Sequence, residues 1–253
     1  MRRSLERLVL AGLAAVLSIA AGVAWYAFST PQAELLPLPA DLVAAPSEEG
    51  QRLLAASPSQ VDHGQLDRFL APQIRRGFCG PATMAAVINA ALEPPVKVTQ
   101  TSLFTPSASA IKSELAVSLS GLTLDELAQM LRAHGLVARV VHADRSDVAS
   151  FRRAAQAALS EPRTYVVVNY DRRVLGQDGA GHISPLGAFN PQGDRVLVLD
   201  VASYRYPYTW VPVDRLWRAM DTVDTDSGWT RGYLLVTAPM EAASAPTTDP
   251  QVR

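Results

Sequence analysis

The sequence predicts an α+β fold, with helices in the first half of the folded region and an antiparallel sheet in the second half. Apolar residues recur at helical spacing in residues 81–92 and 123–134, which predicts helices there. Later runs are β-branched or apolar and are separated by turns rich in glycine and aspartate, which predicts strands. The strands are expected at residues 164–170, 182–190, 195–201 and 233–237.

Local signals mark where the helices begin and end. Pro81 suits the first turn of the first helix, because proline has no amide hydrogen to satisfy there. Thr123 and Glu126 have the spacing of a capping box at the start of the second helix, and Gly135 ends it. A third helix is expected at residues 147–159.

The N-terminus predicts export from the cytoplasm. Three arginines in the first seven residues precede an uncharged run over residues 8–28. The run is long enough to span a bilayer, and Trp25 and Tyr26 near its end suit a membrane interface. A cleaved signal peptide with a small-residue site at 22–24 is the alternative, but the run exceeds the usual length of a signal's apolar region. We expect an uncleaved anchor in a bacterial inner membrane, facing the periplasm, or a periplasmic protein if the signal is cleaved.

Composition divides the chain into four parts. Residues 1–28 are the anchor or signal sequence, and residues 29–64 have the proline- and alanine-rich composition of a linker. Residues 65–239 are the expected catalytic domain, and residues 240–253 an expected disordered tail. A chain of 253 residues with 48% hydrophobic content can bury one domain. Lys plus Arg number 23 against 24 Asp plus Glu, and no basic stripe is present, so no nucleic-acid partner is expected.

Cys79 is the only cysteine and the candidate nucleophile. It can form neither an intramolecular disulfide nor a multi-thiolate metal site, so no metal site is expected. At the start of a helix, unpaired amides and the positive end of the dipole lower a thiol pKa. The backbone amide of Cys79 and the side chain of Gln73, upstream in the chain, would supply an oxyanion hole. The alternative is a buried, inert cysteine.

His182 is the candidate base among the four histidines. It follows a flexible loop at 176–181 and opens a strand, a position that directs a side chain into a cleft. The others have simpler interpretations. His63 falls in the linker, His134 ends a helix and offsets its dipole, and His142 is expected at the surface.

Asp200 is the candidate partner of His182. It follows the apolar residues 196–199, and a turn between antiparallel strands can set it beside His182. A carboxylate there would fix the imidazole tautomer and stabilise imidazolium. A simple cap of the strand end is the alternative. The order Gln, Cys, His, Asp is that of papain-like cysteine peptidases.

Several segments of the second half match one family. They are Gly-His-Ile-Ser-Pro-Leu-Gly-Ala-Phe at 181–189, Val-Leu-Asp-Val-Ala at 198–202, Tyr-Arg-Tyr-Pro at 204–207 and Trp-Val-Pro-Val at 210–213. Shorter matches are Cys-Gly at 79–80, Asn-Ala-Ala-Leu at 89–92, Gly-Leu-Thr at 121–123 and Thr-Arg-Gly-Tyr at 230–233. With these segments the chain resembles the phytochelatin synthase family over about residues 65–239, most specifically from 182 to 212.

The resemblance implies a papain-like fold and a triad of Cys79, His182 and Asp200, with Gln73 matching the oxyanion glutamine. Members of the family attack the Cys-Gly bond of glutathione, release glycine and hold a γ-Glu-Cys acyl group on the thiol. The acyl group passes to water or to a second glutathione, and short bacterial members resemble hydrolases more than synthases. No cofactor is required, while dependence on a cadmium- or zinc-thiolate substrate and a homodimer are left open. The tail lacks the cysteines through which metal sensing would occur.

Asp224 and Arg231 match family positions proposed to hold the γ-glutamyl group. That group carries an α-amine and an α-carboxylate, so its pocket needs an acid and a base side by side. Arg231 can hold a carboxylate with paired hydrogen bonds, which lysine cannot copy. An ion pair at a surface turn is the alternative. Aromatic residues stand at every second position here, as they would on one face of a strand. This pattern predicts a packing role for Tyr204, Tyr206, Tyr208 and Trp210.

The leading hypothesis is a membrane-tethered peptidase of glutathione or a related γ-glutamyl thiol peptide, with transpeptidase activity. A general papain-like peptidase that processes exported peptides is the alternative, and the specific segment 182–212 argues against it. A non-enzymatic metal- or thiol-binding protein would need more soft ligands than one cysteine and scattered histidines. Export leaves the natural substrate open, because glutathione is most abundant in the cytosol.

Overall fold

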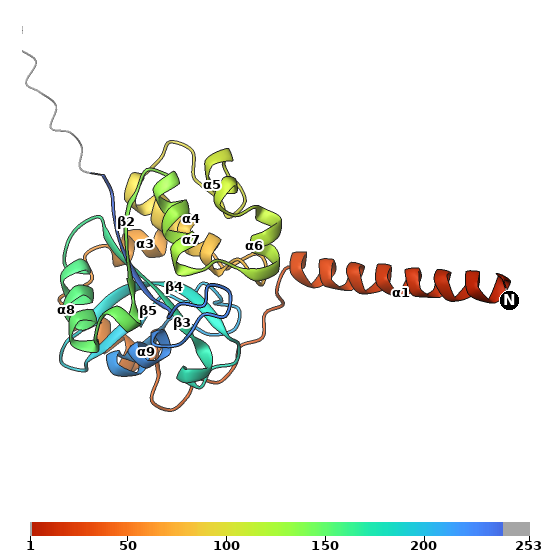
Figure 1. Cartoon of the computed structure of the whole chain (residues 1–253). Helices are drawn as coiled ribbons and strands as arrows, with labels where there is room; N and C mark the ends of the chain where they lie inside the picture. The colour runs from red at the N-terminus through yellow and green to blue at the C-terminus, as the bar shows by residue number, and fades with distance from the viewer. Residues whose placement is uncertain (1, 240–253) are drawn as a thin grey trace, which may run out of the picture.

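The computed structural model describes residues 2–239, and the expected tail at 240–253 lies outside the described residues (Figure 1). The first half is mainly helical and the second half mainly strands, which confirms the α+β prediction. The helices are α1 (Arg2–Phe28), α2 (Glu48–Ala55), α3 (His63–Phe69), α4 (Cys79–Leu92), α5 (Pro106–Ile111), α6 (Glu114–Ser120), α7 (Leu124–Ala133), α8 (Val148–Ala158) and α9 (Val213–Met220), with short 3-10 turns at Ala143–Arg145 and Arg172–Leu175. The strands are β1 (Val43–Ala44), β2 (Val137–His142), β3 (Thr164–Asp171), β4 (Gly181–Asn190), β5 (Arg195–Val198), β6 (Thr209–Pro212) and β7 (Gly232–Thr237).

The strands form one seven-stranded sheet in the order β1-β6-β5-β4-β3-β7-β2. Every neighbouring pair is antiparallel. β3 lies inside the sheet, where Val167 pairs with Pro185 of β4 on one side and with Leu234 of β7 on the other. The candidate residue His182 therefore lies on a strand that is paired on both sides, while Asp200 follows the neighbouring strand β5.

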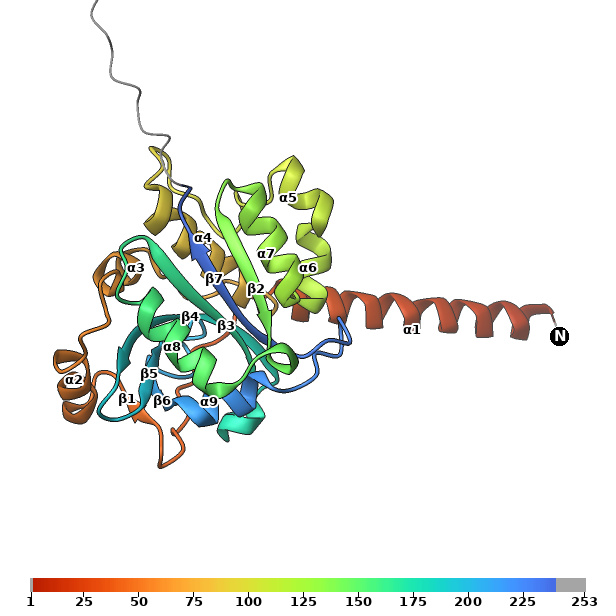
Figure 2. The same cartoon turned by 60° about the vertical axis from the view of Figure 1, so that its left-hand side comes forward.

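Helices cover both faces of the sheet (Figure 2). One core joins α4 and α7 to the sheet, and Tyr165 and Val167 of β3 belong to it. A second core joins α8 and α9 to the other face, and it contains Val166 and Val168. Successive side chains of a strand point to opposite faces, so a strand covered on both faces is an unbroken apolar run. This explains why residues 164–170 lack polar alternation.

The three expected helices are present as α4, α7 and α8. The capping box of α7 is formed: the Thr123 hydroxyl accepts from the Glu126 amide, and the Glu126 carboxylate accepts from the Thr123 amide. β5 ends at Val198, earlier than the expected residue 201, so Asp200 follows the strand rather than ending it.

Residues 29–64 differ from the linker that their composition predicts. β1 pairs with β6 through Val43 and Trp210, and the Trp210 indole donates to the carbonyl of Gly50 at 3.0 Å. α2 and the start of α3 also lie in this segment. Prolines interrupt backbone hydrogen bonding, but they do not prevent a segment from packing along the edge of a sheet.

The tyrosine-rich segment before β6 packs as predicted at Tyr206 and Trp210, but it does not form the predicted face of a strand. Residues 203–206 form a turn, and β6 begins only at Thr209. Trp210 and Tyr206 are buried, whereas Tyr204 and Tyr208 are partly exposed. The alternation of aromatic residues therefore reflects a turn that enters a strand, not one face of a strand.

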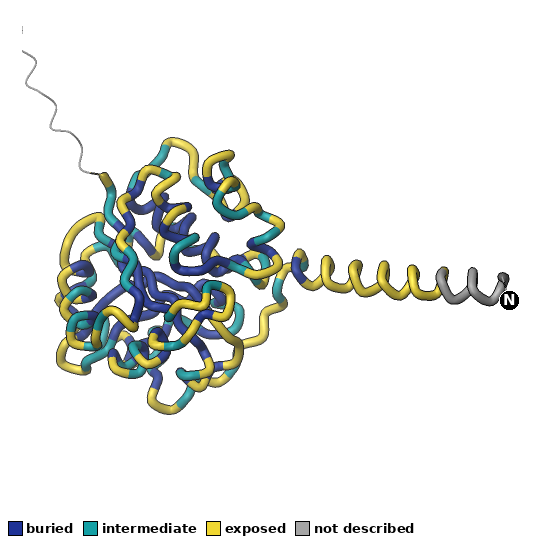
Figure 3. The backbone as a smooth tube through the Cα atoms, viewed as in Figure 1, coloured by how far each residue is buried: buried dark blue, intermediate teal, exposed yellow. Residues whose placement is uncertain are grey.

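α1 projects from the rest of the molecule (Figures 1 and 3). Its segment Leu10–Phe28 has a mean hydropathy of 1.8 and is long and apolar enough to cross a membrane, a property that signal sequences share. Almost all of the described side chains of this segment are exposed, but Ala27, near its end, is buried.

Candidate active site

Cys79 begins α4, at the place that the sequence predicts. Pro81 lies in the first turn of this helix, and residues 79–91 are all buried. The chain at Gly80 passes so close to Leu122 that a Cβ there would lie 2.8 Å from the Leu122 Cδ1 atom. Glycine at position 80 thus lets the segment before α7 pack directly on the start of α4. The sulfur is held at a fixed point between the helical half and the sheet.

His182 and Asp200 are hydrogen-bonded in the sheet half. The Nε2 atom of His182 lies 2.9 Å from Oδ1 of Asp200, and both side chains are buried. A carboxylate only accepts, so this bond places the imidazole proton on Nε2 and leaves Nδ1 as the basic nitrogen. The ring of Tyr170, which pairs with His182 across β3 and β4, meets the imidazole edge-on at 5.7 Å. The imidazole is therefore fixed in position and in tautomer.

Arg172 completes this cluster, and sequence reasoning missed it. Its Nη2 atom donates to both carboxylate oxygens of Asp200, at 2.8 and 2.7 Å, and Nη1 donates to Oε1 of Gln177 at 2.9 Å. The Arg172 and Asp200 side chains are only 4% and 2% exposed. The amide of Ala202 also donates to Asp200. Asp200 is thus bound by a cation, an imidazole and a backbone amide at once.

Burial and charge shift the ionisation of all members of this cluster. Burial opposes ionisation of Asp200, but His182 and Arg172 outweigh it and hold the pKa of this carboxyl well below its usual range. Burial, together with the Arg172 cation, lowers the pKa of His182 despite the opposing effect of Asp200. The imidazole is consequently neutral near neutral pH and can accept a proton.

The pKa of the Cys79 thiol is shifted in the direction opposite to the one that the sequence predicts. Burial raises the pKa of Cys79, although backbone hydrogen bonds from Ile183 and Gly80 and the charge of Arg172 act in the opposite direction. Desolvation thus outweighs the effect of the helix N-terminus, which the sequence predicts would lower this pKa. Both shifts, of Cys79 and of His182, favour the uncharged form of the side chain.

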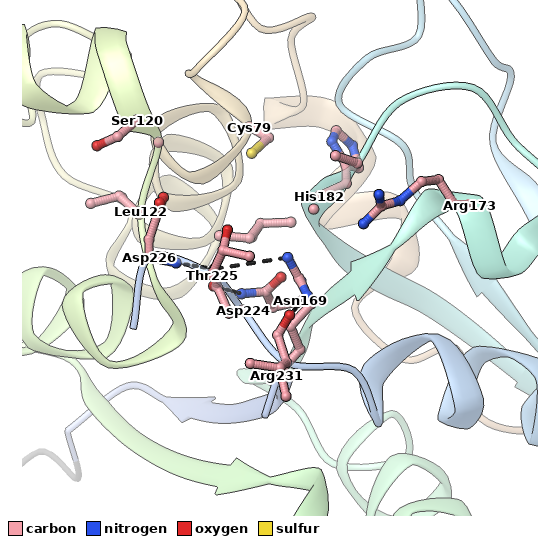
Figure 4. A pocket seen from close by; sticks show the side chains of 15 residues that line it. Cys79, Ser120, Leu122, Asn169, Arg173, His182, Asp224, Thr225, Asp226 and Arg231 are labelled. Carbon is pink, nitrogen blue, oxygen red and sulfur yellow. Dashed lines mark hydrogen bonds and ion pairs between the residues drawn. The ribbon is translucent and has the colours of Figure 1, made fainter. Parts of the chain in front are cut away.

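Cys79 and His182 line one pocket, together with Asn169, Asp224 and Arg231 (Figure 4). In the figure, Cys79 and His182 lie at one end of the pocket, and the other three side chains gather at the opposite end. The pocket therefore joins a thiol and an imidazole to a polar end that carries both charges. Asn169 is a lining residue that the sequence did not indicate.

The polar end is buried rather than a surface turn. Nη2 of Arg231 lies 3.8 Å from Oδ1 of Asp224, and these side chains are only 7% and 12% exposed. Nη1 of Arg231 donates to the Val223 carbonyl and the Thr222 hydroxyl, while Nε is buried without a hydrogen-bond partner. A Cβ at Gly181 would lie 2.8 Å from the Arg231 guanidinium, so the glycine makes room for this side chain. The alternative of an exposed ion pair is thereby excluded.

Gln73 is buried beside the cluster, but its amide hydrogens are engaged. Nε2 donates to the carbonyls of Arg75 and Arg76, both at 2.9 Å, and Oε1 is buried without a hydrogen-bond partner. Donation to an oxyanion would require one of these bonds to be given up. The role of Gln73 as an oxyanion donor stays a prediction.

The other histidines lie apart from this pocket. His142, expected at the surface, is buried: Nδ1 lies 2.5 Å from the Thr230 carbonyl and Nε2 lies 3.0 Å from an Asp125 carboxylate oxygen. The reason is that β2 pairs with β7, which places His142 under the chain that leads into β7. His63 begins α3 instead of lying in a linker, and His134 ends α7 as expected.

Comparison with known proteins identifies the family. A family model described as phytochelatin synthase matches residues 33–233. The chain belongs to the phytochelatin synthase family. It is similar to glutathione gamma-glutamylcysteinyltransferase 3 of Lotus japonicus, with 30% identity over 208 residues, 78% of this chain and 43% of the relative. It is also similar to glutathione gamma-glutamylcysteinyltransferase of Schizosaccharomyces pombe, with 29% identity over 181 residues, 68% of this chain and 42% of the relative.

The match extends into the segment that composition suggested is a linker, since it begins at residue 33. This agrees with the pairing of β1 and β6. The chain spans less than half the length of these phytochelatin synthase relatives.

Proposed function

We propose that this phytochelatin synthase family member cleaves the Cys-Gly bond of glutathione, or of a related γ-glutamyl thiol peptide, through a γ-Glu-Cys acyl-enzyme. The observation that carries the proposal is that Cys79 and His182 share one pocket with Arg231 and Asp224, and that His182 is hydrogen-bonded to Asp200. Such a pocket can hold the two charges of a γ-glutamyl group at one end and attack a carbonyl at the other. The arrangement is the one expected of a papain-like peptidase.

Cys79, His182 and Asp200, together with water or a second glutathione, account for every bond and proton of the reaction. The Cys79 sulfur attacks the carbonyl carbon of the cysteinyl residue while its proton passes to Nδ1 of His182. The same proton then goes to the glycine nitrogen, the C–N bond breaks, and glycine leaves with a thioester on Cys79. Water, or the amine of a second glutathione, attacks the thioester and returns the thiol. Asp200 stabilises the imidazolium that forms in each half-reaction.

The two cavities that His182 lines differ in the charged side chains that they contain. The pocket with Asp224 and Arg231 suits the γ-glutamyl group, whose α-amine and α-carboxylate need opposite charges. His182 also lines a second cavity, together with Arg76, Arg172, Arg205 and Asp178. Arg172 is engaged by Asp200 and Arg205 by Asp178, so Arg76 is the cation there that suits the carboxylate of the departing glycine. We therefore assign this second cavity to the leaving group and to the incoming acceptor.

Incubation of the full chain with glutathione, with products identified by mass spectrometry, tests the proposal. Glycine and γ-Glu-Cys are expected from hydrolysis, and γ-Glu-Cys-extended glutathione from transfer. Addition of cadmium or zinc would show whether a metal thiolate is the preferred substrate. Cleavage of ordinary peptides with no action on glutathione would instead favour a general papain-like peptidase that processes exported peptides.

Arg231→Ala is expected to raise KM for glutathione about 10- to 100-fold, the range for loss of hydrogen bonds to a charged group. Arg231→Lys keeps the charge beside Asp224 but loses the fork geometry, so an intermediate KM is expected. Steady-state kinetics on both variants, with thermal unfolding to confirm folding, measures this. An unchanged KM in Arg231→Ala would move the γ-glutamyl site elsewhere.

The pH profile should follow the lowered pKa of His182. Because the neutral imidazole is the active form, a lowered pKa extends activity toward acid. The acid limb of kcat/KM is therefore expected below about 6.5, the ordinary histidine value. A profile of kcat/KM between pH 4 and 8 measures it, and a midpoint above the ordinary value would contradict the proton-transfer role.

A further inference from the structure

The last turns of α1 are attached to the candidate active site. The Arg76 guanidinium lies over the Tyr26 ring at 4.5 Å, and the Arg75 guanidinium lies over the Phe28 ring at 4.8 Å. Arg75 is itself held by Glu114 at 2.7 Å and by the Ser118 hydroxyl at 3.0 Å. Contacts between α1 and α6 accompany these stacks. The helix end is therefore fixed on the segment that leads to Cys79.

The chain that follows α1 adds a second attachment. The amides of Glu34 and Leu36 donate to the carbonyls of Tyr204 and Arg205, both at 2.9 Å. These carbonyls belong to the turn that comes soon after Asp200. The end of α1 is thus held from two sides, by the residues before Cys79 and by the turn after Asp200.

Two cavities have the end of α1 as a wall. One is lined by Val23, Tyr26 and Ala27 together with Cys79 and Gly181. The other is the second cavity, which we assign above to the leaving group. Tyr26, Gln73 and His182 are among its lining residues. Tyr26 is common to both. Tyr26 therefore borders both the cavity that contains the thiol and the cavity that we assign to the departing glycine.

We infer that residues 23–28 of α1 are an integral wall of the catalytic cleft on its leaving-group and acceptor side. The naming of that side rests on the proposed function, whereas the presence of the wall does not. Tyr26 acts as a positioning residue, because its ring fixes the Arg76 guanidinium where a carboxylate of the acceptor would bind. Cleavage of a signal sequence after Ala24 would remove Val23 and the helix that holds Tyr26, so the wall requires that α1 is retained.

Cross-linking tests the wall without any substrate. Cys79 is the only natural cysteine, so a single introduced cysteine gives a defined pair. In the full chain in detergent, Val23→Cys is expected to form an intramolecular bridge with Cys79 on prolonged treatment at alkaline pH with dibromobimane, a short thiol-bridging reagent. The matched control is Val16→Cys, on the same helix face about 10 Å nearer the N-terminus. Both side chains are exposed in the native helix.

The bridge is read as a mass increase of one reagent joining two peptides. A bridge in Val23→Cys and none in Val16→Cys supports the wall. Single alkylation of each thiol without a bridge in Val23→Cys overturns it, and so does equal bridging in both variants. Inactivity of the unmodified chain toward glutathione would contradict the proposed function, but it would not change the cross-linking result.

A second measurement tests the assigned side. Tyr26→Ala is expected to lower the ratio of transfer to hydrolysis about two- to fivefold, as loss of one cation–π contact would. Tyr26→Phe keeps the ring and should restore the ratio. An unchanged ratio in Tyr26→Ala, or a ratio that Tyr26→Phe fails to restore, overturns the positioning role.

Discussion

Cys79→Ser is expected to lower glycine release from glutathione by at least about a thousandfold, because the nucleophile acts together with its base and its loss removes the acyl-enzyme route. The substitution is nearly isosteric and introduces no charge, so the fold should be retained. Amino-acid analysis of free glycine measures the rate, and mass spectrometry of the intact chain detects the γ-Glu-Cys adduct. Neither glycine nor adduct is expected.

The single cysteine provides the control for this variant. One equivalent of a thiol reagent should label the unfolded wild type, and none should label Cys79→Ser. Because burial raises the pKa of Cys79, alkylation of the folded wild type should be slow near neutral pH. Retained glycine release in a correctly folded Cys79→Ser protein would remove the nucleophile assignment.

Arg172→Met is expected to destabilise the protein by about 3–5 kcal/mol, since it leaves the Asp200 carboxylate buried without its cation. It also removes a cation that lowers the pKa of His182, so the acid limb of kcat/KM should move toward higher pH. Denaturant unfolding and the pH profile measure the two effects. A merely structural arginine would alter the first and leave the second unchanged.

Two further variants sharpen this test. Arg218→Met removes an ion pair in which both side chains are more than half exposed, and it should cost at most about 1 kcal/mol. Adding Asp200→Asn to Arg172→Met removes the unpaired charge and should recover part of the stability without restoring activity. If Arg172→Met were as mild as Arg218→Met, the buried pair would not be holding the site together.

The sequence predicted the candidate triad because each member sits at a local signal. Cys79 begins a helix, His182 opens a strand, and Asp200 follows an apolar run. Arg172 was missed because it stands beside Asp171 and Arg173, a charged cluster that resembles a solvated turn. Its burial arises only when the turn after β3 folds back on Asp200, which is distant in sequence.

The predictions that proved wrong also depend on packing between residues that are far apart in the sequence. Residues 29–64 have the composition of a linker, because no local sequence pattern shows that Val43 pairs with Trp210. His142 was predicted to be exposed, because the segment that buries it lies near Thr230, far away in the sequence. The pKa of Cys79 was expected to fall, since a helix start is visible in the sequence while the depth of burial is not.

Cys79 lies on α4, whereas His182 lies on β4 and Asp200 directly follows β5, and this separation has a consequence for evolution and engineering. The thiol belongs to the helical half and the proton-handling pair to the strand half, with about a hundred residues of chain between them. Neither half alone can perform the chemistry. Because one core joins α4 to the sheet, a core substitution that shifts α4 against the sheet would separate the thiol from the imidazole and abolish the proposed reaction.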